Sequence, residues 1–580
     1  MIKPWLPRLP AAALLALLLP PAAAQARLAP ADRAMLDYVE GRLAQASQDY
    51  GEAATSFADA LKLHEDAIAR RRAFDVAMIS GDRKAVARLA QQISLADQSA
   101  PATAVGDSII ALTRAGLAAS ARDWRGYDAA TQAFSAPGRG GESGQMLATL
   151  LEAWGRAGRG DIDAALQLLD PAAASGVARS YLQEHRAHIL AFGKRWSQAA
   201  EAYGQMLAEG GSNVSRLRLS AASTMLQAAP DDPKTREEVL LLLAGGLERD
   251  PQLQAARARM AANPRMTGTQ LGYLVASPAE GLGLMFVRLA ADLSRERATG
   301  AAINFARIAT FTAPDLPDGW LVAADVLSMA ERYDLALQAL QSVPKSDAWR
   351  ELVGIRRVAT LIAAGRDEDA RKLLQQAVQR DGASASDWSR LAELERREKR
   401  AEQAIHAYDR ALALLDDSDS RTRAQLLFLR GSTREQAGDW PEAEKDLRAA
   451  IDLQAENPVY LNYLGYSMLV HGGDLAEARD LIARAYEAMP ESGAITDSMG
   501  WVEYLLGNHE AAVQLLEEAQ SAEPADPTVA DHLGDVYWTI GRRIEARYAW
   551  RSAAALSPEP ELAAALTQKL DFGLDAATRP

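Results

Sequence analysis

Two histidines have the spacing in this chain that comes closest to a metal site. His185 and His188 occur in the segment EHRAH, one helical turn apart, so both rings could point to the same side of a helix. Zinc sites built on one helix use the spacing H-E-x-x-H and a further ligand, and EHRAH offers neither. We therefore interpret the pair as part of an ordinary polar helix face, and the sequence predicts no bound metal.

A glycine-rich stretch is the next candidate for chemistry. APGRGGESG, at residues 136–144, could cradle a phosphate, but it lacks the Lys-Ser/Thr ending and the preceding strand that such a loop needs. A loop between two helices is the simpler interpretation. No nucleophile elbow or serine–lysine pair stands out in the sequence. We predict a protein that is not an enzyme and uses no cofactor; the alternative is an enzyme with a site in the region 100–280.

Small residues recur at fixed spacings toward the C-terminal end. These spacings indicate the helices that would position a functional side chain. A repeat of about 34 residues is one helix pair copied along the chain. Glycine and alanine let two helix backbones approach closely, and proline ends each unit. The spacings are read from Gly534, Gly541, Ala546, Ala553 and Pro558, and 34 residues earlier from Gly500, Gly507, Ala512, Ala519 and Pro524.

This pattern resembles the tetratricopeptide repeat (TPR). The resemblance implies an all-α fold, namely a TPR superhelical solenoid of antiparallel helix pairs with a capping helix at its C-terminal end. Between residues 100 and 280 the pattern is degenerate, and helix pairs are predicted there by continuity. The positions that match the TPR pattern in the last unit are Leu533, Gly534, Tyr537, Gly541, Ala546, Trp550, Ala553 and Pro558.

The repeats divide the chain into predicted segments. Residues 27–275 form N-terminal degenerate repeats, residues 276–558 form the C-terminal TPR array, and residues 559–580 contain the capping helix and a tail. Leucine recurs every fourth residue in this last helix, which predicts that it covers the open face of the last repeat. A docking helix for a partner is the alternative. The leucines are Leu562, Leu566, Leu570 and Leu574.

The first 26 residues have the composition of a cleavable signal peptide. MIKPWLPR is basic, AAALLALLL is apolar, and PPAAAQA supplies the small residues of a cleavage site. The apolar run is too short to cross a bilayer, and no second candidate span follows it. The chain has no cysteine, which excludes disulfides and a lipid attached through cysteine. We predict an exported periplasmic protein that is not a lipoprotein and has no transmembrane segment.

The overall charge limits the class of partner. The formal net charge is −14 at pH 7 and no basic block stands out. Such a chain repels nucleic acid and anionic membranes, so neither is expected as a main partner. Protein partners are predicted instead.

Helical periodicity predicts where a partner would bind. In a TPR array the first helix of each pair lines the concave groove, with groove-facing residues three before, one after and four after the first glycine of the unit. Trp and Tyr on such a face are typical of binding hot spots. The alternative is that these aromatic residues pack between units as core. The predicted groove contains Asn462, Tyr466, Leu469, Asp497, Trp501, Tyr504, Asp531, Asp535 and Trp538.

The composition of this groove predicts the kind of segment it would take. TPRs that clamp chaperone C-terminal carboxylates have lysine and asparagine in the groove, and these positions here hold mainly Asp, Tyr and Trp. An acidic, aromatic groove suits an extended or helical segment with apolar anchors and some Lys or Arg. His532 is expected to pack between helices, and Arg542 and Arg543 to form a solvated edge.

A second resemblance concerns the C-terminal half. GAITDSMGWVEYLLGNHEAAVQLLEEA and ASPAEGLGLMFVRLAADL resemble segments of large exported TPR proteins of Gram-negative bacteria. One member type is an outer-membrane lipoprotein that is the adaptor of a periplasmic carboxy-terminal processing protease and delivers cell-wall hydrolases to it. The resemblance implies a non-catalytic scaffold, although this chain lacks the lipidated cysteine. The alternatives are a scaffold of an envelope secretion or polysaccharide-export machine and a self-assembling structural protein.

Overall fold

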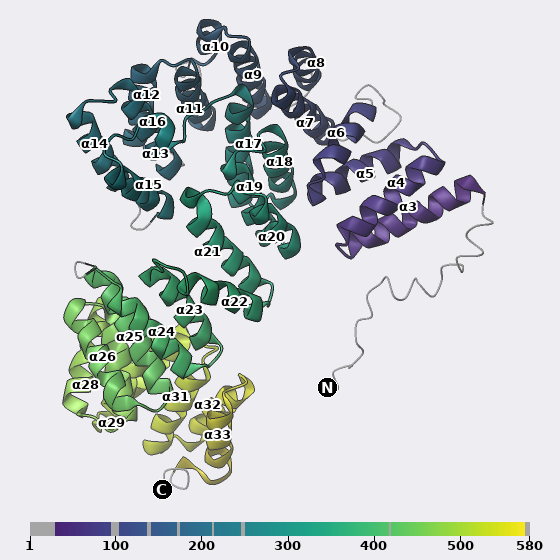
Figure 1. Ribbon diagram of the computed structural model, residues 1–580. Helices are drawn as coiled ribbons and strands as arrows, with labels where there is room; N and C mark the ends of the chain where they lie inside the picture. Colours follow the sequence, from purple (N-terminus) through teal and green to yellow (C-terminus); the bar gives the residue numbers. More distant parts are fainter. Residues whose placement is uncertain are drawn as a thin grey trace. The chain divides into compact units, whose positions relative to one another are not determined.

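The predicted fold class is confirmed: the chain is an all-α TPR-type solenoid of helix pairs (Figure 1). The computed structural model describes residues 29–93, 104–135, 141–170, 175–210, 214–244, 250–416 and 419–574, and within these ranges no strand occurs. The predicted signal peptide, residues 1–26, lies outside the described residues.

The chain divides into two compact units, Met1–Arg366 and Asp367–Pro580, here called unit 1 and unit 2. Unit 1 contains the helices α3 (Pro30–Ala46), α4 (Tyr50–Leu63), α5 (Ala67–Ser80), α6 (Arg83–Gln92), α7 (Ala104–Ala121), α8 (Trp124–Phe134), α9 (Gly141–Gly158), α10 (Ile162–Leu168), α11 (Gly176–Phe192), α12 (Trp196–Ala208), α13 (Val214–Ala228), α14 (Pro233–Ala244), α15 (Pro251–Ala262), α16 (Gly268–Leu271), α17 (Pro278–Arg295), α18 (Thr299–Thr312), α19 (Pro317–Met329), α20 (Tyr333–Gln341) and α21 (Asp347–Ala363).

Unit 2 is a regular run of helix pairs, in which each pair packs on the next. It contains the helices α22 (Asp367–Val378), α23 (Ala385–Arg397), α24 (Ala401–Ala413), α25 (Ser420–Gln436), α26 (Trp440–Leu453), α27 (Pro458–Val470), α28 (Leu475–Ala488), α29 (Gly493–Leu505), α30 (His509–Ala522), α31 (Pro527–Thr539), α32 (Arg543–Ala555) and α33 (Pro560–Phe572).

The last complete pair, α31 and α32, shows why the small residues recur. The Asp526 side chain accepts hydrogen bonds from the first free N–H groups of α31, so the helix begins there. Gly541 has a φ of 88°, a left-handed conformation that glycine adopts without strain, and it forms the turn between the two helices. A Cβ on Gly534 would overlap the Trp550 ring, so only glycine lets α32 lie this close to α31. The spacing of small residues is therefore a packing requirement.

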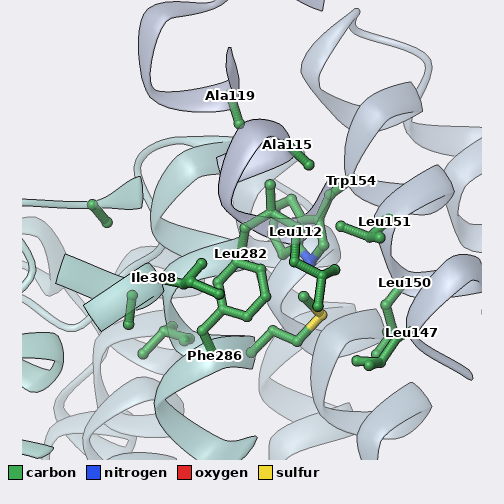
Figure 2. Packing of buried hydrophobic residues seen from close by; sticks show 14 of the residues in the cluster. Leu112, Ala115, Ala119, Leu147, Leu150, Leu151, Trp154, Leu282, Phe286 and Ile308 are labelled. Atoms are coloured by element: carbon green, nitrogen blue, oxygen red, sulfur yellow. The ribbon is translucent and has the colours of Figure 1, made fainter. Parts of the chain in front are cut away.

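Unit 1 contains an arrangement that the repeat pattern does not predict. Helices α17 and α18 pack against α5, α7, α9 and α11, the first helices of successive N-terminal pairs. Figure 2 shows Leu282, Phe286 and Ile308 among side chains of the N-terminal helices, including Leu112 and Trp154. The predicted segment boundary at residue 275 therefore does not coincide with the boundary between the compact units, because residues 278–312 share a core with the helices before them.

The capping helix is confirmed as α33, which packs on α32. Leu566 is completely buried and Leu574 nearly so, while Leu562 and Leu570 are partly buried against the same cluster. The apolar face of α33 thus covers the end of the last pair, as expected for a terminal repeat. Residues 575–580 of the predicted tail lie outside the described residues.

Candidate functional site

His185 and His188 do not lie on a polar helix face; both are completely buried in unit 1, so that interpretation is wrong. The Trp154 Nε1–H donates a hydrogen bond to His185 Nδ1 at 3.1 Å, and the Tyr203 hydroxyl lies 2.6 Å from His188 Nδ1. Burial and the neighbouring His188 lower the pKa of His185 to about 3, which keeps its ring neutral. The rings are buried because neighbouring pairs and α17 enclose α11.

The buried histidines extend into an ion pair that reaches α17. Glu184, on the same helix as the histidines, lies 2.5 Å from Arg288, whose guanidinium stands 3.9 Å from the Tyr181 ring centroid. A buried ion pair fixes the position of the elements that carry it, because separating the charges in this medium is costly. Within the described ranges, no three His, Asp or Glu side chains gather in a way that could hold a metal ion.

The region 100–280, the alternative location for an enzyme site, consists of helices α7 to α16 where it is described. An open recess of about 690 Å³ lies beside α10, α11 and α12. The residues that line it are mainly carboxylates, arginines, glutamines and leucines, and the described ones include no histidine, serine or tyrosine. The first five residues of the glycine-rich stretch lie outside the described residues, and its Gly141 begins α9.

The residues of the predicted groove lie on α27, α29 and α31, the first helices of three consecutive pairs. The structure divides them by burial. Asp497, Asp531 and Asp535 are at least nine-tenths buried, so they are not open groove residues. Helix α29 packs on α27, and α31 packs on α29, and the periodicity of a single helix does not reveal these contacts. The half-buried members are Asn462, Tyr466, Leu469, Trp501, Tyr504 and Trp538.

The first buried acid, Asp497, is paired with a histidine of the following repeat. His532 Nδ1 lies 3.0 Å from Asp497 Oδ2, and its ring stacks on Trp501 with centroids 4.0 Å apart. Burial disfavours the imidazolium, but the carboxylates of Asp497, Asp531 and Asp535 outweigh it and raise the pKa of His532. The expectation that His532 packs between helices is thus confirmed, and the residue joins α31 to α29.

Replacing Asp497 by Asn is expected to lower the pKa of His532, because the nearest carboxylate is removed. A raised folded-state pKa contributes stability that is fully present below the ordinary histidine pKa of 6.5 and is lost as the pH rises through the folded-state pKa. The parent should therefore lose stability as the pH rises from 6.5 through the folded-state pKa of His532, and Asp497→Asn should lose less stability over the same pH range. Titration of the His532 ring by NMR measures the pKa directly; an unchanged midpoint in the variant would contradict the pairing. Asp480→Asn, at an exposed position of α28, is the matched control.

The other two buried acids, Asp531 and Asp535, are held by α33. The Lys569 ammonium donates to Asp531 Oδ1 at 2.7 Å and to Asp535 Oδ2 at 2.8 Å, and Trp550 Nε1–H donates to Asp535 Oδ1 at 2.9 Å. Burial and the adjacent Asp531 raise the pKa of Asp535 to about 6, although Lys569 opposes this shift. The prediction of an acidic groove is therefore wrong for these residues, because they are buried and the Lys569 ammonium bridges them.

Trp538 is also covered. The Arg543 guanidinium lies 3.8 Å from the Trp538 ring centroid. Gly573, at the end of α33, also lies against this ring, so closely that a Cβ at residue 573 would overlap it. Its Nε1 is buried. Trp538 therefore belongs to the packing between α31, α32 and α33, as in the alternative interpretation.

What remains of the predicted groove is an aromatic strip, defined as Tyr466, Trp501 and Tyr504. The rings of Trp501 and Tyr504 have centroids 5.0 Å apart, and the centroids of Tyr466 and His532 are 6.2 Å apart. The Tyr504 hydroxyl lies 3.0 Å from Thr539 Oγ1, which holds its ring in place. Burial and the nearby carboxylates of Asp497 and Asp531 raise the pKa of Tyr466 to about 12, so its hydroxyl stays protonated.

Lys569 is the structural residue that sequence reasoning missed at this site. It is a lone lysine on the leucine-rich face of the last helix, one residue before Leu570. A lysine is rarely buried without a partner, so its place between spaced leucines was a signal that acidic residues lie opposite. None of the described helices is long and apolar enough to cross a membrane.

The chain is similar in sequence to two bacterial proteins. No protein-family profile matches the chain. It aligns at 31% identity over 196 residues with a TPR repeat-containing protein of Pseudomonas aeruginosa, and at 26% over 308 residues with bacteriophage adsorption protein A of Escherichia coli K12. These alignments cover 31% and 49% of this chain, and the chain spans 30% of the length of each relative.

Solved structures with a similar arrangement of helices are distant in sequence. The Cut9–Hcn1 complex of the APC/C has 15% identity and a TM-score of 0.37, with 95% of this chain and 99% of that chain covered. A thermophilic TPR protein of Thermus thermophilus has 19% identity and a TM-score of 0.28, with 32% and 99% covered.

Proposed function

We propose that the chain is a protein-binding scaffold whose aromatic strip grips a segment of a protein partner. The observation that carries this proposal is the strip itself. Tyr466, Trp501 and Tyr504 come from consecutive first helices and remain half-buried after the fold is complete. Large, pre-positioned rings that still present area to a ligand are typical of binding hot spots, because they lose little conformational freedom on binding.

The surroundings of the strip define what it would accept. The three acids beside it are already paired with His532 and Lys569, so the partner need not supply Lys or Arg to them. Apolar side chains of the partner would lie on the Trp501 and Tyr504 rings, and a backbone carbonyl could accept from the Tyr466 hydroxyl. An extended or helical polypeptide segment with apolar anchors satisfies both requirements.

The cellular role that we propose is that of an adaptor in the periplasm. The signal-like composition of residues 1–26 and the absence of cysteine support export. The resemblance of the C-terminal segments to exported TPR proteins supports the delivery of cell-wall hydrolases to a carboxy-terminal processing protease. An adaptor of this kind acts by holding protease and substrate on one chain, which raises their effective concentration without any chemistry of its own.

Replacing Trp501 by Ala is expected to weaken binding of the partner by about thirtyfold, the effect of losing one aromatic hot spot. Affinity capture from a periplasmic extract, with the full chain as bait, identifies the partner, and titration of the purified partner then measures the affinity. We expect the parent to capture a processing protease or a wall hydrolase and Trp501→Ala to lose it.

The control for this experiment is Tyr486→Ala, which removes a half-buried aromatic ring from α28, a second helix of the same array. Circular dichroism checks that both variants are folded. Equal affinity of the parent and Trp501→Ala for the captured protein would exclude the strip as the binding site, and a folded parent that captures neither class of protein would exclude the adaptor role.

A further inference from the structure

Helix α32 carries two exposed stripes that the aromatic strip does not use. One is apolar: Ile544 and Tyr548 are separated by one helical turn and are 71% and 65% exposed. The other is basic and consists of Arg543, Arg547 and Arg551, at the spacing i, i+4 and i+8. Residues one position apart on a helix differ by about 100° around its axis, so the two stripes run side by side.

The three arginines of the basic stripe are held by aromatic rings and backbone. Arg543 lies 3.8 Å from the Trp538 ring centroid, Arg547 lies 5.5 Å from the same centroid and donates to the Leu570 carbonyl, and Arg551 lies 5.9 Å from the Tyr548 centroid. In the part of the chain that the structure describes, none of the three forms an ion pair with a carboxylate.

The neighbouring arginine shows the contrast. Arg542 pairs with Glu517 at 3.2 Å and with Glu545 at 3.1 Å, so its charge is balanced within the chain. The basic stripe is thus a local excess of positive charge on a chain whose net charge is −14. Cation–π contacts position the arginines of this stripe without neutralising them, which leaves their N–H groups able to bind an anion.

The bond from Arg547 to the Leu570 carbonyl brings the end of α33 beside these stripes. Phe572, two residues further on, is 72% exposed. An apolar surface that remains this exposed beside unpaired cations is typical of an interaction site, because burial on a partner would gain free energy from the apolar residues and from the charges together.

We propose that this arginine–aromatic face, defined as Arg543, Ile544, Arg547, Tyr548, Arg551 and Phe572, docks an acidic amphipathic helix of a protein partner. Carboxylates at i and i+4 on such a helix match the one-turn spacing of the arginines, and its apolar side chains pack on Ile544 and Tyr548. The site lies on the second helix of its pair, apart from the aromatic strip, so the two surfaces can be tested separately.

An anionic membrane would offer similar chemistry, but the charge of the chain favours the peptide. A bilayer surface acts on the whole molecule and would repel its excess of acidic residues, whereas a helix meets only the local positive face. The test therefore includes vesicles as a competing ligand.

The experiment uses the full chain and three probes. The first probe is a blocked helical peptide of about 18 residues with Glu and Leu in adjacent stripes, the second is its Lys and Leu counterpart, and the third is a phosphatidylglycerol vesicle. Isothermal titration measures binding at two salt concentrations. We expect only the Glu/Leu peptide to bind, with an affinity that falls as salt is raised.

Two variants locate the site. Arg543→Glu combined with Arg551→Glu should weaken binding of the Glu/Leu peptide by about tenfold or more, and Ile544→Ser should weaken it less while leaving the salt dependence unchanged. Arg547 is kept because it holds the end of α33. Both variants change exposed side chains, and thermal melts check their folding.

Trp501→Ala should bind the Glu/Leu peptide as the parent does, so a failure of this proposal is distinguishable from a failure of the aromatic strip. Equal binding of the Glu/Leu and Lys/Leu peptides would overturn the proposal, as would an unaffected affinity in the double arginine variant. Binding to the vesicles with no binding to the Glu/Leu peptide would also overturn it.

Discussion

Replacing Lys569 by Met is expected to destabilise the C-terminal end of unit 2 by about 3–5 kcal/mol, the range for removing one partner of a buried ion pair. The side chains of Lys569, Asp531 and Asp535 are each at most one-tenth exposed. Without the ammonium, both carboxylates stay buried and lose the cation that bridges them. Urea unfolding measures the loss of stability, and hydrogen exchange shows whether α31, α32 and α33 are the helices that open.

Two further measurements isolate the charge as the cause. Adding Asp531→Asn and Asp535→Asn to Lys569→Met should restore most of the lost stability, because neither carboxylate is then left buried without the ammonium. Lowering the pH to about 5 should also reduce the stability that Lys569→Met loses relative to the parent.

The sign of this pH effect follows from Asp535, whose folded-state pKa of about 6 is above the ordinary aspartate pKa of 3.8. Between these values the folded state binds a proton that the unfolded state does not, so acidification favours the fold. Loss of Lys569 raises this folded pKa further. If the stability lost by Lys569→Met were the same at pH 8 and pH 5, and the triple variant showed no recovery, Lys569 would contribute packing and not charge.

Replacing Phe286 by Ala is expected to destabilise unit 1 by about 3–5 kcal/mol and to leave unit 2 unchanged. Phe286 is completely buried, and its ring stacks on Phe305 with centroids 6.2 Å apart. Truncation leaves a cavity where α17 meets the N-terminal helices. Hydrogen exchange read by mass spectrometry reports the two units separately within the full chain.

The control is Arg295→Ala, on the same helix, whose side chain is 67% exposed and forms an ion pair with Asp292 at the surface. Its effect should be within about 0.5 kcal/mol. Equal loss of protection in both units after Phe286→Ala would contradict the division of the chain at Arg366, and no loss in either would contradict the packing of α17.

The helix pairs could be predicted from the sequence because their causes are local. A glycine at 534 is needed where the Trp550 ring crosses α31, and an aspartate at 526 begins that helix; both act within one repeat of 34 residues. Periodicity also placed Trp501 and Tyr504 on the side of α29 that faces the following pair. The fold class follows from these short-range requirements.

The nature of the site could be predicted only in part, because periodicity places a residue on a helix face without saying what covers it. Asp531 and Asp535 were placed on the groove side of α31, but Lys569 of α33 lies over them and bridges both carboxylates. The packing of α17 against α7, which ends more than 150 residues before α17 begins, leaves no periodic trace either. The run GLGLMF is apolar around the whole helix, which signals burial but does not identify the partner helices.

The position of α17 and α18 has a consequence for how this chain can change in evolution. In unit 2 each pair contacts its neighbours along the chain, so a pair can be duplicated or deleted and the rest can close up as before. In unit 1 one helical hairpin is matched to several N-terminal pairs at once through its apolar side chains and the Glu184–Arg288 ion pair. Adding or removing a pair there would shift every later contact out of register. Unit 1 has thereby given up the modularity of a repeat protein, while unit 2 keeps it.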